Sequence, residues 1–170
     1  MALDSSSAGQ AFQAEIQAQM GRETPLSNAD MAKKLAQVYL DYSKAATVPG
    51  ADMSAGGDVS ILEDAFQVVD PAAQVQKLAT GICNYWATFA TPGIPAHGGT
   101  AVESVTVAGA AMIPAMTATI QSLVTDQEVP DPFVKFFQTT ESVVKTIPVT
   151  VVEIIPVPPP TPTPFPEFIQ

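Results

Sequence analysis

The stretch Asp70-Pro-Ala-Ala-Gln-Val-Gln-Lys-Leu-Ala-Thr-Gly-Ile-Cys-Asn-Tyr-Trp-Ala-Thr-Phe-Ala-Thr-Pro92 carries the clearest structural signal in the chain. An aspartate followed by proline is typical of a helix start, with the aspartate as N-cap and the proline in the first turn. Apolar residues then recur at spacings of three and four, as in Val75, Leu78 and Ile82. This period indicates a helix that buries one face. The stretch therefore predicts an amphipathic helix over residues 70–91, ended by Thr91-Pro92.

Comparable helix starts lie on both sides of this segment. Ser27 with Asp30 has the spacing of an N-cap, and Leu26 and Met31 occupy the hydrophobic-staple positions. Capping-box patterns begin at residues 60 and 100, and a second Asp-Pro pair begins at residue 131. We therefore expect a mainly α fold, a small bundle of about four or five helices. The expected segments are 7–20, 27–48, 60–69, 70–91, 100–123 and 131–147, with a strand as the alternative for 60–69.

The segment 100–123 contains two features that argue against an unbroken helix. Residues 102–107 are rich in β-branched side chains, which lower helix propensity. Pro114 lies inside the helical pattern and should kink it. Small residues from Ala108 to Ala118 would let another helix pack closely.

The character of the sequence changes near Ile147. Eight of the sixteen prolines fall in residues 148–170, and the run from Pro156 onward excludes a helix or an inner strand. We therefore expect a helical domain over residues 1–147 and an extended proline-rich arm over 148–170. The β-branched stretch 149–155 predicts a strand that pairs with a sheet edge of a neighbouring chain. The alternative is an apolar strap along its own domain.

Composition excludes several classes of function. The 170 residues contain 17 acidic and 7 basic side chains, a formal net charge of −10, which argues against nucleic-acid binding. A single cysteine and a single histidine exclude an internal disulfide and cysteine- or histidine-rich metal sites. No stretch has the pattern of a signal peptide or the length of a membrane span. The sequence thus predicts a protein made in the cytoplasm, with no cofactor and no membrane or nucleic-acid partner.

Catalytic chemistry has few candidate residues. His97 is the sole possible histidine base, and it lies in a loop of glycine and proline. Cys83 falls among apolar residues of the 70–91 helix, which indicates a buried, inert thiol. The acidic residues 126, 128 and 131 lack an EF-hand pattern and are expected to form a solvated loop. Gly98-Gly99 precedes a predicted helix start but lacks the lysine of a phosphate-binding loop.

Residues 81–107, which include Tyr85-Trp86 and Pro95-Ala-His-Gly-Gly-Thr100, resemble small virion structural proteins of tailed bacteriophages. The resemblance implies a helical body with a Tyr-Trp helix end and a Pro-Ala-His-Gly-Gly loop that opens another helix. It also implies a non-enzymatic part of the head–tail (neck) or tail region, present as rings of identical copies. The proline-rich arm lies outside the resemblance.

The sequence thus favours a non-enzymatic assembly protein of a phage virion. Its expected partners are further copies of itself and other virion proteins, which the arm would tether. One alternative is a helical binding module with an apolar groove lined by Trp86, Phe89 and methionines. A second is an enzyme using His97, which predicts a nucleophile or carboxylate within about 3 Å of the ring. The expected interface residues are Tyr85, Trp86, His97, Val149, Val151, Ile154, Pro156, Phe165 and Phe168.

Overall fold

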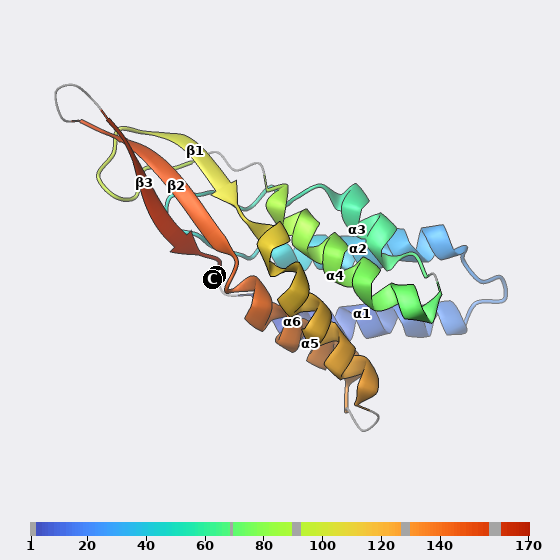
Figure 1. Cartoon of the computed structure of the whole chain (residues 1–170). Helices are drawn as coiled ribbons and strands as arrows, with labels where there is room; N and C mark the ends of the chain where they lie inside the picture. The colour runs from blue at the N-terminus through green and yellow to red at the C-terminus, as the bar shows by residue number, and fades with distance from the viewer. Residues whose placement is uncertain (1–2, 69, 90–92, 127–129, 157–160) are drawn as a thin grey trace.

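The computed structural model describes residues 3–68, 70–89, 93–126, 130–156 and 161–170. Over these ranges the chain is mainly helical, as expected, and also contains a small antiparallel sheet. The helices lie together at one end of an elongated molecule, and the sheet projects from the other end (Figure 1). The elements are α1 (Ser5–Met20), α2 (Asn28–Ser43), α3 (Val59–Phe66), α4 (Pro71–Ala87), β1 (Ala101–Val107), the 3-10 helix η1 (Gly109–Met112), α5 (Ile113–Thr125), α6 (Pro132–Val144), β2 (Pro148–Ile155) and β3 (Thr161–Phe168).

Two of the predicted helix starts are confirmed by their caps. The Asp70 side chain accepts a hydrogen bond from the backbone N–H of Ala72 at 2.8 Å, and α4 begins at the proline between them. Ser27 accepts from the N–H of Asp30 at 3.1 Å and begins α2. The expected cap of α3 is corrected from Ser60 to Asp58. The expected stop of the fourth helix at Thr91-Pro92 lies outside the described residues, and α4 ends at Ala87.

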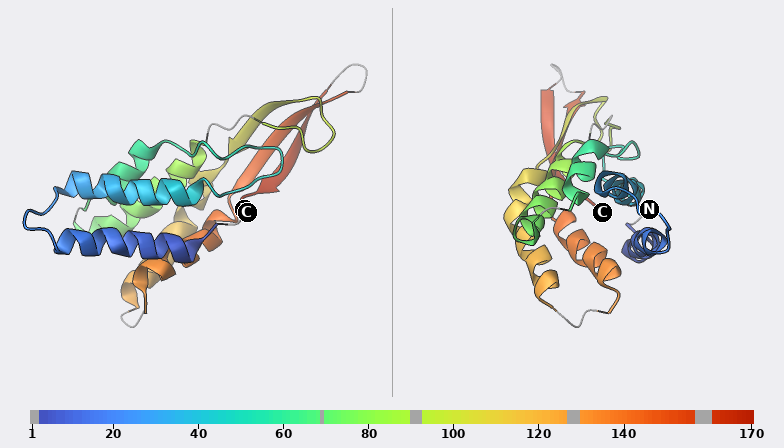
Figure 2. Two further views of the ribbon diagram at one scale, coloured as in Figure 1. Left: turned by 180° about the vertical axis from the view of Figure 1, so that it is seen from behind. Right: turned by 90° about the vertical axis from the view of Figure 1, so that its right-hand side faces the viewer.

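The helices enclose one core. Each helix packs against the next along the chain, and α6 packs back against α1 (Figure 2). Tyr39, Tyr85, Trp86 and Phe137 are fully buried between them, and the indole N–H of Trp86 donates to the Tyr39 hydroxyl at 3.1 Å. Tyr85 and Trp86 are therefore core residues, which corrects their assignment to an interface.

Residues 101–107 form β1, so the helix expected over 100–123 is wrong in its first part. β1 pairs antiparallel with β2, and four of its seven residues are β-branched, which suits a pleated sheet. The backbone then passes through η1, and α5 begins at Ile113 with Pro114 in its first turn. Pro114 therefore starts a helix instead of kinking one, because a first-turn residue needs no N–H.

The strand expected over 149–155 is confirmed as β2, but its expected partner in another chain is wrong. β2 is the middle strand of the order β1-β2-β3, so both of its edges are paired within the same chain. Within the segment expected to form an extended arm, β2 pairs with β1 on one side and with β3 on the other (Figure 1). Part of the proline run, residues 161–168, is itself the edge strand β3.

The alternating prolines of β3 fit its place at the edge. Pro162, Pro164 and Pro166 face Ile154, Val152 and Thr150. Proline has no N–H, so these are the non-hydrogen-bonded pairs, in which the backbone groups of β3 point away from β2. The outer edge of β3 therefore presents no N–H donor from residue 162 to residue 166. Such an edge is protected against the addition of another strand.

The two faces of the sheet have different surroundings. Val149, Val151 and Glu153 are buried on the inner face, beneath the loops around Gly50 and Gly99. The β-bulge of β1 between Val102 and Ser104 increases its twist beside these loops. The chain end is attached to the same region, since Thr47 and Gln170 exchange two backbone hydrogen bonds of 3.1 and 2.9 Å.

Candidate functional site

Glu153 is a carboxylate with no exposed surface, on the inner face of the middle strand β2. Its oxygens accept hydrogen bonds from the backbone N–H groups of Ala96, His97 and Gly99 at 2.7, 3.1 and 3.0 Å. A Cβ on Gly99 would lie 2.7 Å from the nearer carboxylate oxygen, so the loop closes this tightly only with glycine there. Gly98 has a positive φ of 90°, a conformation that glycine adopts without strain. The Pro-Ala-His-Gly-Gly loop is thus shaped around an internal anion.

His97 lies between two carboxylates. Its Nδ1 is 3.0 Å from an oxygen of Glu153, and its Nε2 is 2.8 Å from an oxygen of Glu167 on β3. The imidazole stacks on the ring of Phe165, with centroids 4.2 Å apart and planes 7° from parallel. These contacts join the loop to both β2 and β3. We call Glu153, His97, Glu167 and Phe165 the sheet lock.

The charges of the sheet lock reinforce one another. The hydrogen bond to Glu153 raises the pKa of His97, opposed by partial burial and assisted by Glu167. For Glu153, burial opposes ionisation, but the N–H donors of the loop and the His97 ring outweigh it and lower its pKa to about 2. The arrangement therefore favours an imidazolium that donates to two carboxylates.

The sheet lock meets the distance that an enzyme using His97 predicts, because carboxylates lie within about 3 Å of the ring. Both ring nitrogens are engaged, however, and the ring is covered on one side by Phe165. Burial raises the pKa of Cys83 to about 11, and this thiol lies in the helical core. Within the described ranges, no three His, Cys, Asp or Glu side chains gather as metal ligands. The geometry supports a structural role for His97.

The outer face of the sheet has a different composition. We call it the outer sheet face. None of its described residues carries a charge, although Glu103, the extra residue of the β1 bulge, lies beside it. Phe168 is 54% exposed, and the three prolines of β3 are also exposed. Its residues are Ala101, Ser104, Thr106, Thr150, Val152, Ile154, Pro162, Pro164, Pro166 and Phe168.

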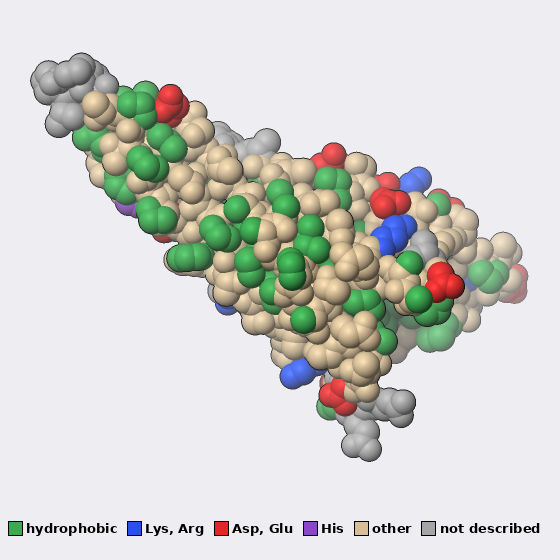
Figure 3. Space-filling view, viewed as in Figure 1, with side chains coloured by type: hydrophobic (Ala, Val, Ile, Leu, Met, Phe, Trp, Pro, Cys, Tyr) green, Lys and Arg blue, Asp and Glu red, His purple; other side chains and the backbone are tan. Residues whose placement is uncertain are grey.

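This uncharged surface continues onto the helical part. The chain has no charged residue from Ser104 to Thr125, and Ala110, Ala111, Pro114 and Ala115 are exposed within that range. Figure 3 shows hydrophobic side chains over the projecting sheet and onward over the start of α5. Contiguous apolar patches of this kind mark interaction surfaces more often than isolated apolar side chains do.

The structure distributes the sequence-predicted site residues over several places. His97 and Phe165 meet in the sheet lock, and Val149 and Val151 are buried on the inner face. Ile154 and Phe168 lie on the outer sheet face, and Pro156 is exposed beyond β2. Tyr85 and Trp86 belong to the helical core.

Glu153 and Glu167 are functional residues that the sequence did not predict. A signal for Glu153 exists, since the period of a strand places it on the same face as Val149 and Val151. An acidic residue on the apolar face of a strand requires donors from elsewhere in the chain.

The chain matches no family model, and comparisons with curated proteins and with solved structures find no match. None of the helices within the described ranges is long and apolar enough to cross a membrane.

Proposed function

We propose that this protein is a non-enzymatic assembly protein that docks to further copies of itself through the outer sheet face. The observation that carries the proposal is the uncharged, exposed and largely apolar character of this face in a chain with a net charge of −10. Identical acidic chains repel one another over most of their surface. They approach most closely where neither copy presents a charge.

The edges of the sheet support docking by the face instead of by strand addition. The prolines of β3 remove the N–H donors from one outer edge, and the bulge interrupts the other edge strand. A layered sheet covers its apolar face by packing it on another element. A second copy would provide such an element by packing sheet on sheet, about 10 Å apart.

A place in a phage virion, as a ring at the neck or tail, is a further part of the proposal. It is supported by the resemblance of residues 81–107. The structure differs from the resembling pattern at one point, because the Pro-Ala-His-Gly-Gly loop opens the strand β1 and not a helix. Other virion proteins would then be the partners beyond the self-docked copies.

Light scattering over a range of protein concentrations tests self-docking. We expect a mass of at least two chains, each of 17.8 kDa. A mass of one chain at every concentration would contradict docking between copies.

The competing proposal is an enzyme that uses His97, favoured by the two carboxylates at its ring nitrogens. The substitution His97→Gln separates the two proposals. An assembly protein would lose stability and keep its capacity to associate once folded, whereas an enzyme would lose turnover of its substrate.

A further inference from the structure

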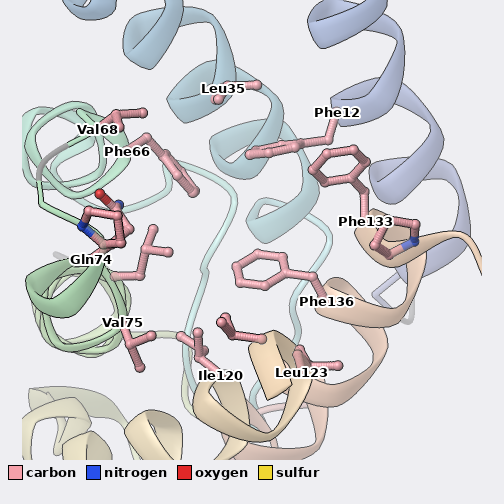
Figure 4. A pocket seen from close by; sticks show the side chains of 14 residues that line it. Phe12, Leu35, Phe66, Val68, Gln74, Val75, Ile120, Leu123, Phe133 and Phe136 are labelled. Atoms are coloured by element: carbon pink, nitrogen blue, oxygen red, sulfur yellow. The ribbon is translucent and has the colours of Figure 1, made fainter. Parts of the chain in front are cut away.

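An apolar groove lies at the end of the helical part that is distant from the sheet. Its volume is about 480 Å³, within the range of protein binding pockets. One wall is the first half of α4, and the opposite wall is formed by the end of α5 and the start of α6 (Figure 4). Phe12 of α1, Leu35 of α2 and Phe66 of α3 also line it. We call this feature the helix-end groove.

The lining of the groove is almost entirely apolar. Among the fourteen lining residues that the structure describes, Gln74 has the one polar side chain, and its amide donates to the carbonyl of Ala65 at 3.4 Å. Val68 and Val124, two of the most exposed large apolar side chains described, lie in this lining with 70% and 64% of their surface exposed. Water therefore covers apolar surface that an apolar occupant would bury.

Acidic residues flank the groove at the ends of its helices. Asp70 directly precedes the lining residue Pro71, and Asp131 directly precedes the lining residue Pro132. Asp126 follows Val124 by two positions, and all three carboxylates are exposed. Of the nearby cations, Lys77 lies 3.4 Å from Asp64, and Lys135 is exposed one turn into α6. The helix ends around the groove are thus predominantly acidic.

We propose that the helix-end groove binds an amphipathic helix of a partner protein, with apolar residues at i, i+3, i+4 and i+7 and with lysine or arginine beside them. Such a stripe spans roughly 10 Å and fits a groove between helices. The acidic flanks favour a basic partner. A second copy of this acidic chain, with 7 basic residues, does not have that complementarity.

A small polar substrate fits the groove less well than a helix does. Sites for such molecules hold a few polar groups that fix the orientation of the ligand. The described lining offers one amide for this purpose, and it is already used on Ala65. The proposal does not depend on self-docking by the outer sheet face.

Fluorescence anisotropy with a labelled 18-residue probe peptide tests the proposal. The probe combines a helical leucine stripe with flanking lysines. One control peptide has glutamates in place of the lysines, and another has a scrambled order that disperses the leucines. We expect saturable binding of the basic striped peptide alone, because both the stripe and the positive charge are required.

The matched protein variants are Val68→Lys with Val124→Lys, and Met20→Lys as control, with circular dichroism to verify folding. All three positions are more than half exposed, and Met20 does not line the groove. The groove variant should weaken binding at least about tenfold, and Met20→Lys should leave it unchanged. In the unaltered chain, the peptide should slow hydrogen exchange in residues 71–78 and 132–136.

Several results would overturn the proposal. Equal binding of the scrambled peptide would show attraction by charge alone, and equal binding of the glutamate peptide would remove the role of the acidic flanks. Saturable binding of decanoate in place of the peptide would identify an apolar ligand pocket. A fall in the solution mass of the groove variant would identify a second copy as the occupant. In contrast, failure of self-docking alone would leave peptide binding intact.

Discussion

The sheet lock makes stability depend on pH through two residues with opposite shifts. The pKa of His97 is raised in the folded chain. Its contribution to the stability of the fold is therefore complete below the ordinary pKa of 6.5 and is lost as pH rises through the raised pKa. The pKa of Glu153 is lowered in the folded chain. Its contribution to the stability of the fold is therefore complete above the ordinary pKa of 4.5 and is lost as pH falls towards about 2. The pKa values of three further carboxylates are lowered, so their protonation at acid pH also reduces the stability of the fold; these are Asp4, Asp52 and Asp58.

We therefore expect the melting temperature to be highest between about pH 4.5 and 6.5. In His97→Gln the decline above pH 6.5 should be strongly reduced, because the titrating ring is absent. Differential scanning calorimetry from pH 3 to 9 measures both profiles. An unchanged alkaline decline in His97→Gln would show that another group controls it.

Gly99→Ala tests the loop that encloses Glu153. The added Cβ would lie 2.7 Å from a Glu153 oxygen and 2.8 Å from its Cβ, so the loop must move. We expect a destabilisation of about 1–3 kcal/mol in urea unfolding. Gly21→Ala is the matched control, since its Cβ would meet nothing closer than 3.9 Å. Equal urea-unfolding midpoints for the two variants would contradict the tight packing of this loop on Glu153.

At the scale of elements, the helices were largely predictable and the sheet was not. The caps at Ser27 and Asp70 and the apolar period after them are local signals, so they were visible in the sequence. The sequence predicts a helix in place of β1 because Thr100 and Glu103 have the spacing of a capping box. Its β-branched residues favoured a strand, but a strand requires a partner, and β2 lies more than 40 residues away. Pairing at such a separation leaves no local pattern.

The candidate site was predictable to a similar extent. His97 and the glycines beside it were recognised as a distinctive loop, but the anion that this loop surrounds is 54 to 57 residues away. The missing N–H groups of the proline run exclude an inner strand, but the sequence predicts an extended arm there and not the edge strand β3. The association of this run with its own chain was not predictable, since the backbone alone gives no preference between an internal and an external partner.

Removal of residues 161–170 tests whether the last strand is part of the fold. The truncation removes Phe165 and Glu167 from the sheet lock and the buried side chain of Ile169. Loss of one such apolar side chain costs about 2–5 kcal/mol, so we expect the melting temperature to fall by roughly 10 °C. A truncated chain that melts at the original temperature would show that the segment behaves as a free arm.

The prolines of β3 are expected to prevent edge-to-edge association. Threonine at positions 162, 164 and 166 restores three outward N–H donors without adding apolar surface. The triple variant should aggregate at concentrations where the original chain remains clear, as measured by turbidity and by thioflavin fluorescence. Pro156→Thr, outside β3, serves as the control. A clear solution of the triple variant would assign the protection to another feature.

The whole molecule combines two exposed apolar surfaces at opposite ends. The outer sheet face is uncharged and suits a further acidic copy, whereas the helix-end groove is flanked by carboxylates and suits a basic partner. The sheet lock fixes the sheet on its loops, so the outer face is presented on a rigid support. Two distinct surfaces would allow a protein to associate with itself and with another component at the same time.

Val152→Glu tests the central claim, which is that copies dock through the outer sheet face. Val152 lies on that face in the middle strand, and the substitution adds a charge where two acidic copies would meet. Met20→Glu adds the same charge at a 74% exposed position outside the sheet. Circular dichroism verifies that both variants are folded, and light scattering then measures their mass. The account predicts an oligomer for the original chain and for Met20→Glu, and a single chain of 17.8 kDa for Val152→Glu. An unchanged oligomer in Val152→Glu, or a single chain in all three proteins, would contradict it.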